Sequence, residues 1–214
     1  MREVSVSALR ASGGKTPSAL KLEVFERDGE HVVEGVLRGA DGEFFPVMRG
    51  VPVFLLGELR PDLTDFCRRH NLPLPKERAN PHAEGQAQTN VTFSDKWKRF
   101  KNYGIEPAHE EFLFGWYCKK FNLPDRDALK AFYSDRDMVL EVGPGSGFNS
   151  RFIAQNCRGQ HFALDISEAA FTTFENTRQL PNCTVVQADL MHAPFADDTF
   201  DFVIADGVLH HTPN

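Results

Sequence analysis

The C-terminal half of this 214-residue chain alternates short apolar runs with amphipathic segments. The apolar runs are MVLEV, QHFALDI, CTVVQAD and FDFVIAD, and the segments between the first three are NSRFIAQNC and EAAFTTFENTRQL. Continuous apolar runs of this length are typical of strands that are buried on both faces of a parallel sheet. The alternation therefore predicts an α/β fold with a doubly wound parallel sheet built from βαβ units.

A glycine-rich turn follows the first apolar run. The strand expected at 138–142 leads into GPGSG at 143–147, and a helix is expected to begin near Phe148. Glycines let the backbone turn sharply and approach a ligand, and a new helix N-terminus presents free N–H groups to an anion. A P-loop is excluded because no Gly-Lys-Ser/Thr follows, and the third glycine comes one residue too early for the dinucleotide pattern G-x-G-x-x-G. Taken alone, the glycine-rich stretch is also compatible with a structural turn that binds no ligand.

Acidic residues mark three of the expected strand ends. Glu141 lies in the first strand, Asp165 ends the second, and Asp189 follows the third. A carboxylate at the Asp165 position can accept from both ribose hydroxyls of a nucleoside that lies across the sheet edge. The Asp189 carboxylate can accept from the exocyclic amine of adenine. The alternatives are a helix N-terminal acid at Asp165, a role that Ser167 fills better, and a solvated loop acid at Asp189.

The N-terminal part of the chain has a different pattern. Between residues 20 and 56, β-branched and aromatic residues are interrupted by turn signals, which predicts a β-meander with strands near 21–26, 31–37, 43–47 and 51–55. A short helix behind Pro61 would close it. The next segment is polar and proline-rich and is interpreted as a linker, so the expected domains are 1–75, 76–91 and 92–214.

Charge and cysteine content limit the partners and the compartment. A net charge of −6 argues against bulk nucleic-acid binding, although a local basic groove stays open. The four cysteines are scattered without a CxxC spacing, which favours reduced thiols and a cytoplasmic location. No apolar run approaches the roughly 20 residues that cross a bilayer, so no membrane span is expected.

The ordered motifs resemble those of class I S-adenosylmethionine-dependent methyltransferases, in the methyltransferase type 11-like group. They are VLEVGPGSG, ALDIS and QADLMHAPFADDTFDFVIADGVLHHTPN, and the likeness covers about Phe93 to Asn214. It implies a Rossmann-like sheet, S-adenosylmethionine as the cofactor, and methyl transfer by in-line attack on the sulfonium methyl. A small-molecule acceptor is favoured by the acidic balance, while tRNA and protein acceptors stay open.

The resemblance also implies which residues bind the cofactor. They are Glu141, Gly143, Gly145, Gly147, Asp165, Ile166, Asp189, Leu190 and Asp206. The first four would hold the methionine end and Asp165 the ribose hydroxyls. Ile166 would pack on the adenine, Asp189 and Leu190 would read its edge, and Asp206 would face the sulfonium. In the lead-in FSDKWKRF, Trp97 and Phe100 are expected to line the cofactor or substrate mouth.

Two histidines follow the fourth strand, where an acceptor would approach. His210 is the candidate catalytic residue, because imidazole titrates near neutrality and can act as a general base. The alternative for His210 and His211, which we favour, is local packing or hydrogen bonding in the first turn of a helix.

The N-terminal block resembles, more weakly, the small zinc-ribbon-like domain that accompanies some methyltransferases. Zinc-binding relatives carry a CxxC where this chain has Gly39-Ala-Asp-Gly42. Without those thiols a tetrahedral thiolate site cannot be built, so we expect no metal. The domain is interpreted as a protein-interaction or lid element.

Only four strands of the sheet can be identified, in the expected spatial order 3-2-1-4, against seven in a complete class I domain. We therefore expect a C-terminally truncated fragment that holds the cofactor cradle but not the whole substrate pocket. The fourth strand would be an open edge where a protein partner or a second copy could pair. The alternative function is a catalytically inactive scaffold that docks a partner enzyme, and a nicotinamide dehydrogenase is disfavoured by the early third glycine.

Overall fold

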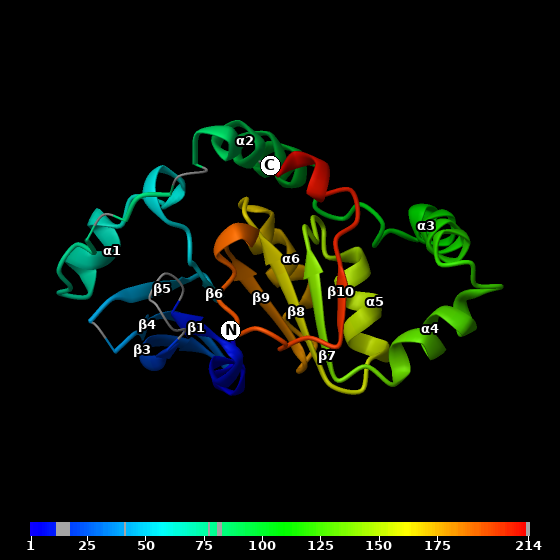
Figure 1. The fold of residues 1–214 in the computed structure, drawn as a ribbon, viewed down its shortest axis with the longest axis horizontal. Coiled ribbons are helices and arrows are strands. Elements are labelled where there is room, and N and C mark those ends of the chain that lie inside the picture. The colour runs from blue at the N-terminus through cyan, green and yellow to red at the C-terminus, as the bar shows by residue number, and fades with distance from the viewer. Residues whose placement is uncertain (12–17, 41, 77, 81–82, 213–214) are drawn as a thin grey trace.

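The computed structural model describes residues 1–11, 18–40, 42–76, 78–80 and 83–212. It contains an antiparallel sheet from the N-terminal part, a parallel sheet beside it, and helices that cover the far face and the top of the parallel sheet (Figure 1). This is the α/β architecture predicted from the alternating runs. The turn at 39–42 and the segment at 76–91 contain residues 41, 77 and 81–82, which lie outside the described residues.

The antiparallel sheet is the predicted β-meander. Its strands follow one another in the order β3-β4-β5-β6, and their bounds are Lys21–Asp28, His31–Arg38, Phe44–Met48 and Val51–Pro52. A short 3-10 helix (Glu3–Ala8) and the strand pair β1 (Arg10–Ala11) and β2 (Ser18–Ala19) precede it. Helix α1 (Thr64–Arg69) closes the meander by burying Phe66 and Cys67 against Val36 and Phe44.

The parallel sheet has the strand order β10-β7-β8-β9, which confirms the predicted order 3-2-1-4. The strands are β7 (Met138–Val142), β8 (Gln160–Asp165), β9 (Cys183–Gln187) and β10 (Phe202–Ile204). Helices α5 (Phe148–Asn156) and α6 (Ala169–Thr177) connect the first three strands as crossovers. Among the described residues β10 pairs only with β7, and Val203 on it is 53% exposed.

The two sheets share one hydrophobic core. Phe45 and Phe54 of the N-terminal part belong to the same buried cluster as Val142 and Leu164 of the parallel sheet. The chain after β6 also extends the parallel sheet: Val53 forms a parallel bridge to Gln187, and the Phe54 N–H donates to the Gln187 carbonyl at 2.8 Å. The β-meander therefore packs on one face of the sheet and covers its β9 edge, whereas helices α5 and α6 lie on the other face (Figure 1).

Three further helices precede the parallel sheet, namely α2 (Ala83–Arg99), α3 (Pro107–Lys120) and α4 (Arg126–Ser134). Helix α4 begins at Asp125, whose side chain accepts from the Ala128 N–H at 2.8 Å, and it buries Leu129 and Tyr133. Helix α2 takes in the second half of the segment that we interpreted as a linker. The segment is helical from residue 83 on, and Gln86 and Asn90 of this helix donate hydrogen bonds to Asp189 and to the Ile166 carbonyl.

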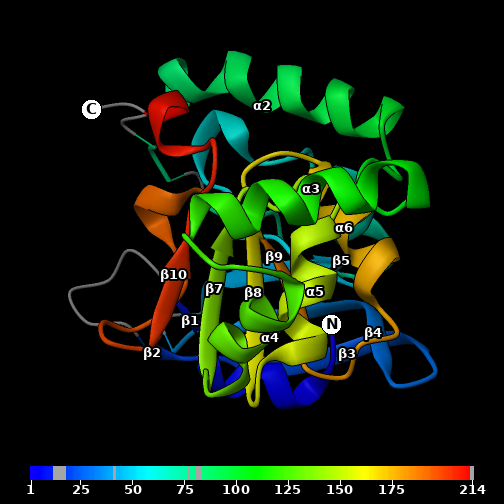
Figure 2. The ribbon, with the colours of Figure 1, turned by 90° about the vertical axis from the view of Figure 1, so that its right-hand side faces the viewer.

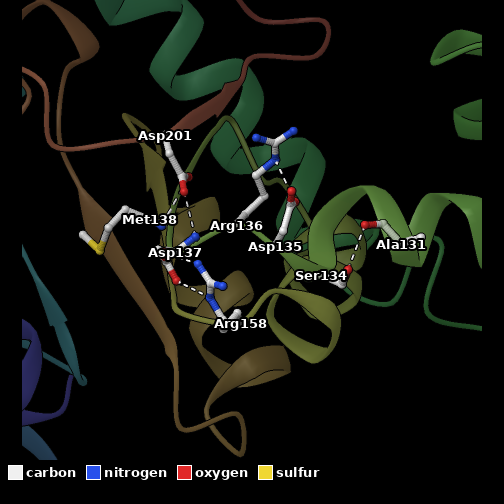
Figure 3. Close-up of polar contacts among 8 residues, drawn as sticks. All are labelled: Ala131, Ser134, Asp135, Arg136, Asp137, Met138, Arg158 and Asp201. Carbon is white, nitrogen blue, oxygen red and sulfur yellow. Dashed lines mark hydrogen bonds and ion pairs between the residues drawn. The ribbon is translucent and has the colours of Figure 1, made fainter.

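Polar contacts fix the amino ends of the central strands (Figure 3). The Asp201 carboxylate accepts from the backbone N–H groups of Asp137 at 2.7 Å and Met138 at 3.3 Å. The Asp137 side chain in turn accepts from Arg158 Nε at 2.7 Å. Asp201 thus holds the first residues of β10 beside the first residues of β7. This end of the sheet is a structural clamp and lies opposite the carboxyl ends where ligands bind in open α/β sheets.

No helix in the described part of the chain combines the length and the apolar character that a membrane crossing needs. The cysteines Cys67, Cys118, Cys157 and Cys183 are all unpaired. Within the described residues, no group of three or more His, Cys, Asp or Glu side chains is arranged to hold a metal ion.

Candidate functional site

A cavity of about 250 Å³ lies at the carboxyl ends of the parallel strands, under helix α2. Figures 1 and 2 show α2 crossing above the strand ends. The cavity wall contains residues that follow all four strands, together with one face of α2. Of the residues implied as cofactor-binding, it brings together Gly143, Asp165, Ile166, Asp189, Leu190 and Asp206. Glu141, Gly145 and Gly147 do not line it.

The glycine turn is left-handed at all three glycines, with φ of 69° at Gly143, 60° at Gly145 and 81° at Gly147. L-residues adopt this region rarely, so the turn requires glycine on backbone grounds alone. Close packing adds a second requirement. A Cβ at Gly143 would lie 2.4 Å from Val208 Cγ2, and a Cβ at Gly145 would lie 2.4 Å from Trp97 Cζ2. The turn is thus shaped for close approach by the cavity wall and by Trp97.

Glu141 lies beneath the glycine turn rather than in the cavity. Its buried carboxylate accepts from Asn149 Nδ2 at 3.1 Å and from the Ser150 hydroxyl, both at the start of α5. His161 Nε2 is 3.4 Å from the same carboxylate, but the angle does not give a hydrogen bond. In this arrangement Glu141 ties α5 to β7 and holds the turn from below. Its contact with a methionine end remains a prediction.

Asp165 is placed as the sequence predicts, at the end of β8 and at the cavity wall. Its Oδ1 accepts from the Ser167 N–H at 2.8 Å and from the Ser167 hydroxyl at 2.7 Å. The Ser167 hydroxyl accepts in turn from the Ala169 N–H at 3.2 Å, at the beginning of α6. Burial raises the pKa of the Asp165 carboxyl from 3.8 to about 6, against the lowering effect of these bonds.

This raised pKa predicts a pH-dependent affinity for a ribose-containing ligand. Ribose hydroxyls donate to the carboxylate, so they favour its ionised form and lower its pKa in the complex. Binding should be constant above the pKa of about 6 and weaken below it, by about tenfold at pH 5 relative to neutral pH. Calorimetry from pH 5 to pH 8 measures this. The Asp165→Asn protein should bind more weakly and lose the slope, whereas a slope that persists would assign it to another group.

Asp189 follows β9 and is 2% exposed, so it is not a solvated loop acid. Its Oδ1 accepts from Gln86 Nε2 at 2.8 Å and the Met191 N–H at 3.0 Å. Its Oδ2 lies 3.1 Å from His192 Nδ1 and 3.4 Å from Asn80 Nδ2. A carboxylate offers about four acceptor positions, and protein groups already use four here. Asp189 is thus held at the wall by its own chain.

The end of β10 contributes Asp206 and His211. Asp206 forms an ion pair with Lys120 of α3. His211 lines the cavity and its ring packs against Phe93 at 5.1 Å between centroids. His210, the candidate catalytic residue, is not among the lining residues, and its ring lies 3.9 Å from that of His211. The structure therefore brings the neighbouring histidine, His211, to the cavity.

Helix α2 supplies a wall that the sequence reading largely missed. Gln86, Thr89, Phe93, Lys96 and Trp97 line the cavity from this helix. Trp97 lines the cavity, whereas Phe100 is 56% exposed and does not line it. The residues at 86, 89/90, 93 and 97 have the spacing of one helical face. Half of them are polar, however, and an analysis of hydrophobic periodicity does not detect polar faces.

Two hydrogen bonds fasten α2 to the sheet. Asn90 Nδ2 donates to the Ile166 carbonyl at 2.9 Å, and the Glu168 N–H donates to the Ser94 hydroxyl at 3.0 Å. Both partners lie in the loop that connects β8 to α6. The helix therefore roofs the cavity over the residues that would surround an adenine.

Comparison with known proteins finds a family match for the part of the chain that carries the strand ends of this cavity, but not for helix α2. The protein family described as "Methyltransferase domain" matches residues 140–214, which include the glycine turn and the strand ends. This part of the chain is similar to that methyltransferase family. A curated human relative, named arginine-hydroxylase NDUFAF5, mitochondrial, is 27% identical over 126 residues. The match covers 56% of this chain and 34% of that protein, so the chain spans about a third of the relative.

Two solved structures resemble the fold. A SAM-dependent methyltransferase from Aquifex aeolicus is 26% identical, with 42% of this chain and 54% of that chain covered and a TM-score of 0.34. Haemonchus contortus phosphoethanolamine N-methyltransferase 1, solved with phosphoethanolamine and S-adenosylhomocysteine, is 16% identical, with 61% and 27% covered and a TM-score of 0.47. The family match and the cavity itself, rather than these two likenesses, support the assignment.

The cofactor of this family, S-adenosylmethionine, fits the residues at the site. Asp165 offers a buried carboxylate for ribose hydroxyls, and the aliphatic side chains of Ile166 and Leu190 offer apolar surface for a base. Gln86 is 2% exposed, and its Oε1 has no hydrogen-bond partner among the described residues. An unpaired buried acceptor costs about 1–3 kcal/mol, which a ligand donor would recover.

Proposed function

We propose that this chain holds the S-adenosylmethionine site of a methyltransferase and supports methyl transfer to an acceptor by in-line attack on the sulfonium methyl. The observation that carries the proposal is the buried Asp165 carboxylate, which lies in the segment that matches the methyltransferase family and at the wall of the cavity. The cofactor supplies the electrophilic methyl, so no residue has to form a covalent intermediate. What remains for the protein is to bind, orient and exclude water.

Each of these tasks has a candidate group in the cavity. Asp165 would accept from the ribose hydroxyls, and Ile166 and Leu190 would enclose the adenine. The glycine turn at 143–147 would let the methionine end approach the backbone. Asp206 would face the sulfonium, held in place by its ion pair with Lys120. Trp97 and helix α2 would keep water from the reacting centre, because they cover the turn and the strand ends.

For the methyl acceptor we propose only a chemical class. The net charge of −6 favours a small-molecule acceptor over nucleic acid. His211 is better placed than His210 to meet an acceptor, because it lines the cavity. Within the described part of the chain β10 pairs with β7 alone, and its other edge is where we would expect a protein partner or a second copy to pair. We keep the cytoplasmic location as a prediction from the unpaired cysteines.

A catalytically inactive scaffold is the second candidate. The observation that favours it is the Asp189 carboxylate, whose acceptor positions are filled by protein groups as in a closed structural site. A protein with a sequence similar to this chain is named an arginine-hydroxylase, and a fold does not by itself determine the reaction. The two candidates differ in a simple property, which is whether the cavity binds the methyltransferase product S-adenosylhomocysteine.

Calorimetric titration of the whole chain with S-adenosylhomocysteine tests the proposal. We expect saturable one-to-one binding. In a separate fluorescence titration, reduced nicotinamide cofactor should not bind. Absence of S-adenosylhomocysteine binding would overturn the proposal. A pull-down that then yields one stoichiometric protein partner without cofactor would support the scaffold instead.

A further inference from the structure

Gln86 lines the cavity and carries a buried side-chain atom that has no hydrogen-bond partner among the described residues. It lies on α2, is 2% exposed, and donates from Nε2 to Asp189 Oδ1 at 2.8 Å. Its carbonyl oxygen, Oε1, is buried without a hydrogen-bond partner among the described residues. A primary amide prefers to pair its acceptor as well as its donors, and a buried unpaired carbonyl is unusual in folded proteins.

The orientation of this amide is fixed by Asp189. Turning the Gln86 amide over would place its carbonyl oxygen against Asp189 Oδ1, which is repulsive and removes the hydrogen bond between the two side chains. Because Oδ2 and the remaining position of Oδ1 are engaged by His192, Asn80 and Met191, the carboxylate cannot rotate away freely. The network therefore presents a single acceptor, the Gln86 carbonyl, rather than the carboxylate itself.

We propose that Gln86 reads the adenine of the cofactor, by accepting from its exocyclic amine. This inference rests on the proposed function. Gln86 lines the cavity on the same side as Asp189 and Leu190, and α2 is fastened above this side through Asn90 and the Ile166 carbonyl. Asp165 anchors the ribose one strand away, so the base is directed toward this group of residues.

Asp189 then acts through Gln86 as a positioning residue. The resemblance implies instead that Asp189 contacts adenine directly. Here the acceptor positions of its carboxylate are already occupied by protein groups. The arrangement also discriminates between bases. Adenine has an amine donor at its 6-position, whereas hypoxanthine has a carbonyl there, which would face the Gln86 carbonyl and leave two buried acceptors unpaired.

The test compares S-adenosylhomocysteine with S-inosylhomocysteine, which carries a carbonyl in place of the 6-amine and a hydrogen on N1, by calorimetry on the whole chain. The wild-type protein should prefer the adenosyl ligand by about 10-fold to 100-fold, the range expected when buried polar groups are left unpaired. Gln86→Leu should weaken adenosyl binding by a similar factor and change inosyl binding little, so that the preference nearly disappears. Gln88→Leu is the matched control, since Gln88 is exposed on the same helix and bonds Thr92 instead.

A second variant keeps the test decisive if Gln86→Leu fails to fold. In Asp189→Asn the new side-chain amide can donate to Gln86 Oε1, which releases the Gln86 Nε2 toward the base, so the preference should shift toward the inosyl ligand. An unchanged preference in both variants, with adenosyl binding intact, would overturn the role of Gln86. Failure of the wild-type protein to bind either ligand would instead overturn the proposed function.

Discussion

Replacing Asp165 with Ala should abolish most of the affinity for S-adenosylhomocysteine, with a loss of about 100-fold or more. The carboxylate would accept from two ribose hydroxyls, and hydrogen bonds to a charged group contribute about 1.5–3 kcal/mol each. Asp165 is buried at the cavity wall, so bulk water would not replace it fully. Calorimetric titration at neutral pH measures the loss.

The same substitution should harm binding more than folding. The folded-state pKa of about 6 lies above the ordinary 3.8, so below pH 3.8 the buried group adds stability that is lost as pH rises through 6. At neutral pH the buried carboxylate therefore disfavours the folded state. Removing it relieves this cost and partly offsets the loss of its bonds to Ser167.

The control for this experiment is Asp197→Ala, an exposed aspartate in the loop before β10. It should leave both the affinity and the melting temperature unchanged. If Asp165→Ala binds S-adenosylhomocysteine as tightly as the wild-type protein while remaining folded, the ribose role is wrong. If both variants lose affinity equally, the effect is one of charge over the whole surface and not of this site.

The strands and their acids could be read from the sequence because their signals are local. Each buried strand is a continuous apolar run, and Asp165 and Asp189 come at the point where such a run ends. Parallel packing then brings the ends together without any further information. The strand order β10-β7-β8-β9 agrees with the order that the resemblance to class I methyltransferases implied.

The roof of the cavity could not be read in the same way. Gln86 and Asn90 lie in a polar segment whose helical face meets polar groups of the sheet, so neither hydrophobicity nor the proline-rich surroundings indicates a buried helix. The hydrogen bonds of the Asp189 carboxylate could not be predicted from the sequence either. Its donors Gln86 and Asn80 lie about a hundred residues earlier in the chain, and only the tertiary fold brings them to the carboxylate.

The shared core was hidden as well. The composition change near residue 76 gave no sign that Phe54 and Leu164 lie in one cluster or that Val53 pairs with Gln187. A segment that pairs with a distant sheet has the same local residue pattern as a segment that pairs with its neighbours in the sequence. Pairing between distant segments therefore has no signature in a single sequence.

Replacing Gly159 with Ala should destabilise the protein by roughly 3 kcal/mol, which corresponds to about 6–12 °C in melting temperature for a chain of this size. Gly159 directly precedes β8, and its N–H donates to the Arg136 carbonyl at 3.1 Å. An added Cβ would lie 2.0 Å from the Asp137 carbonyl oxygen, which is backbone and cannot rotate away. The starts of β7 and β8 would have to separate, and Asp137 is also clamped by Asp201 and Arg158 (Figure 3).

Gly115→Ala is the matched control, because it should have the opposite sign. Gly115 is exposed within α3 and has no neighbour within 4 Å of an added Cβ. Alanine in a helix is favoured over glycine by about 0.5–1 kcal/mol, so this protein should be slightly more stable. Urea denaturation of both proteins gives the two free energies of unfolding. Equal stability of Gly159→Ala and the wild type would contradict the close approach of the two strand starts, and with it the register that brings Asp165 level with the glycine turn.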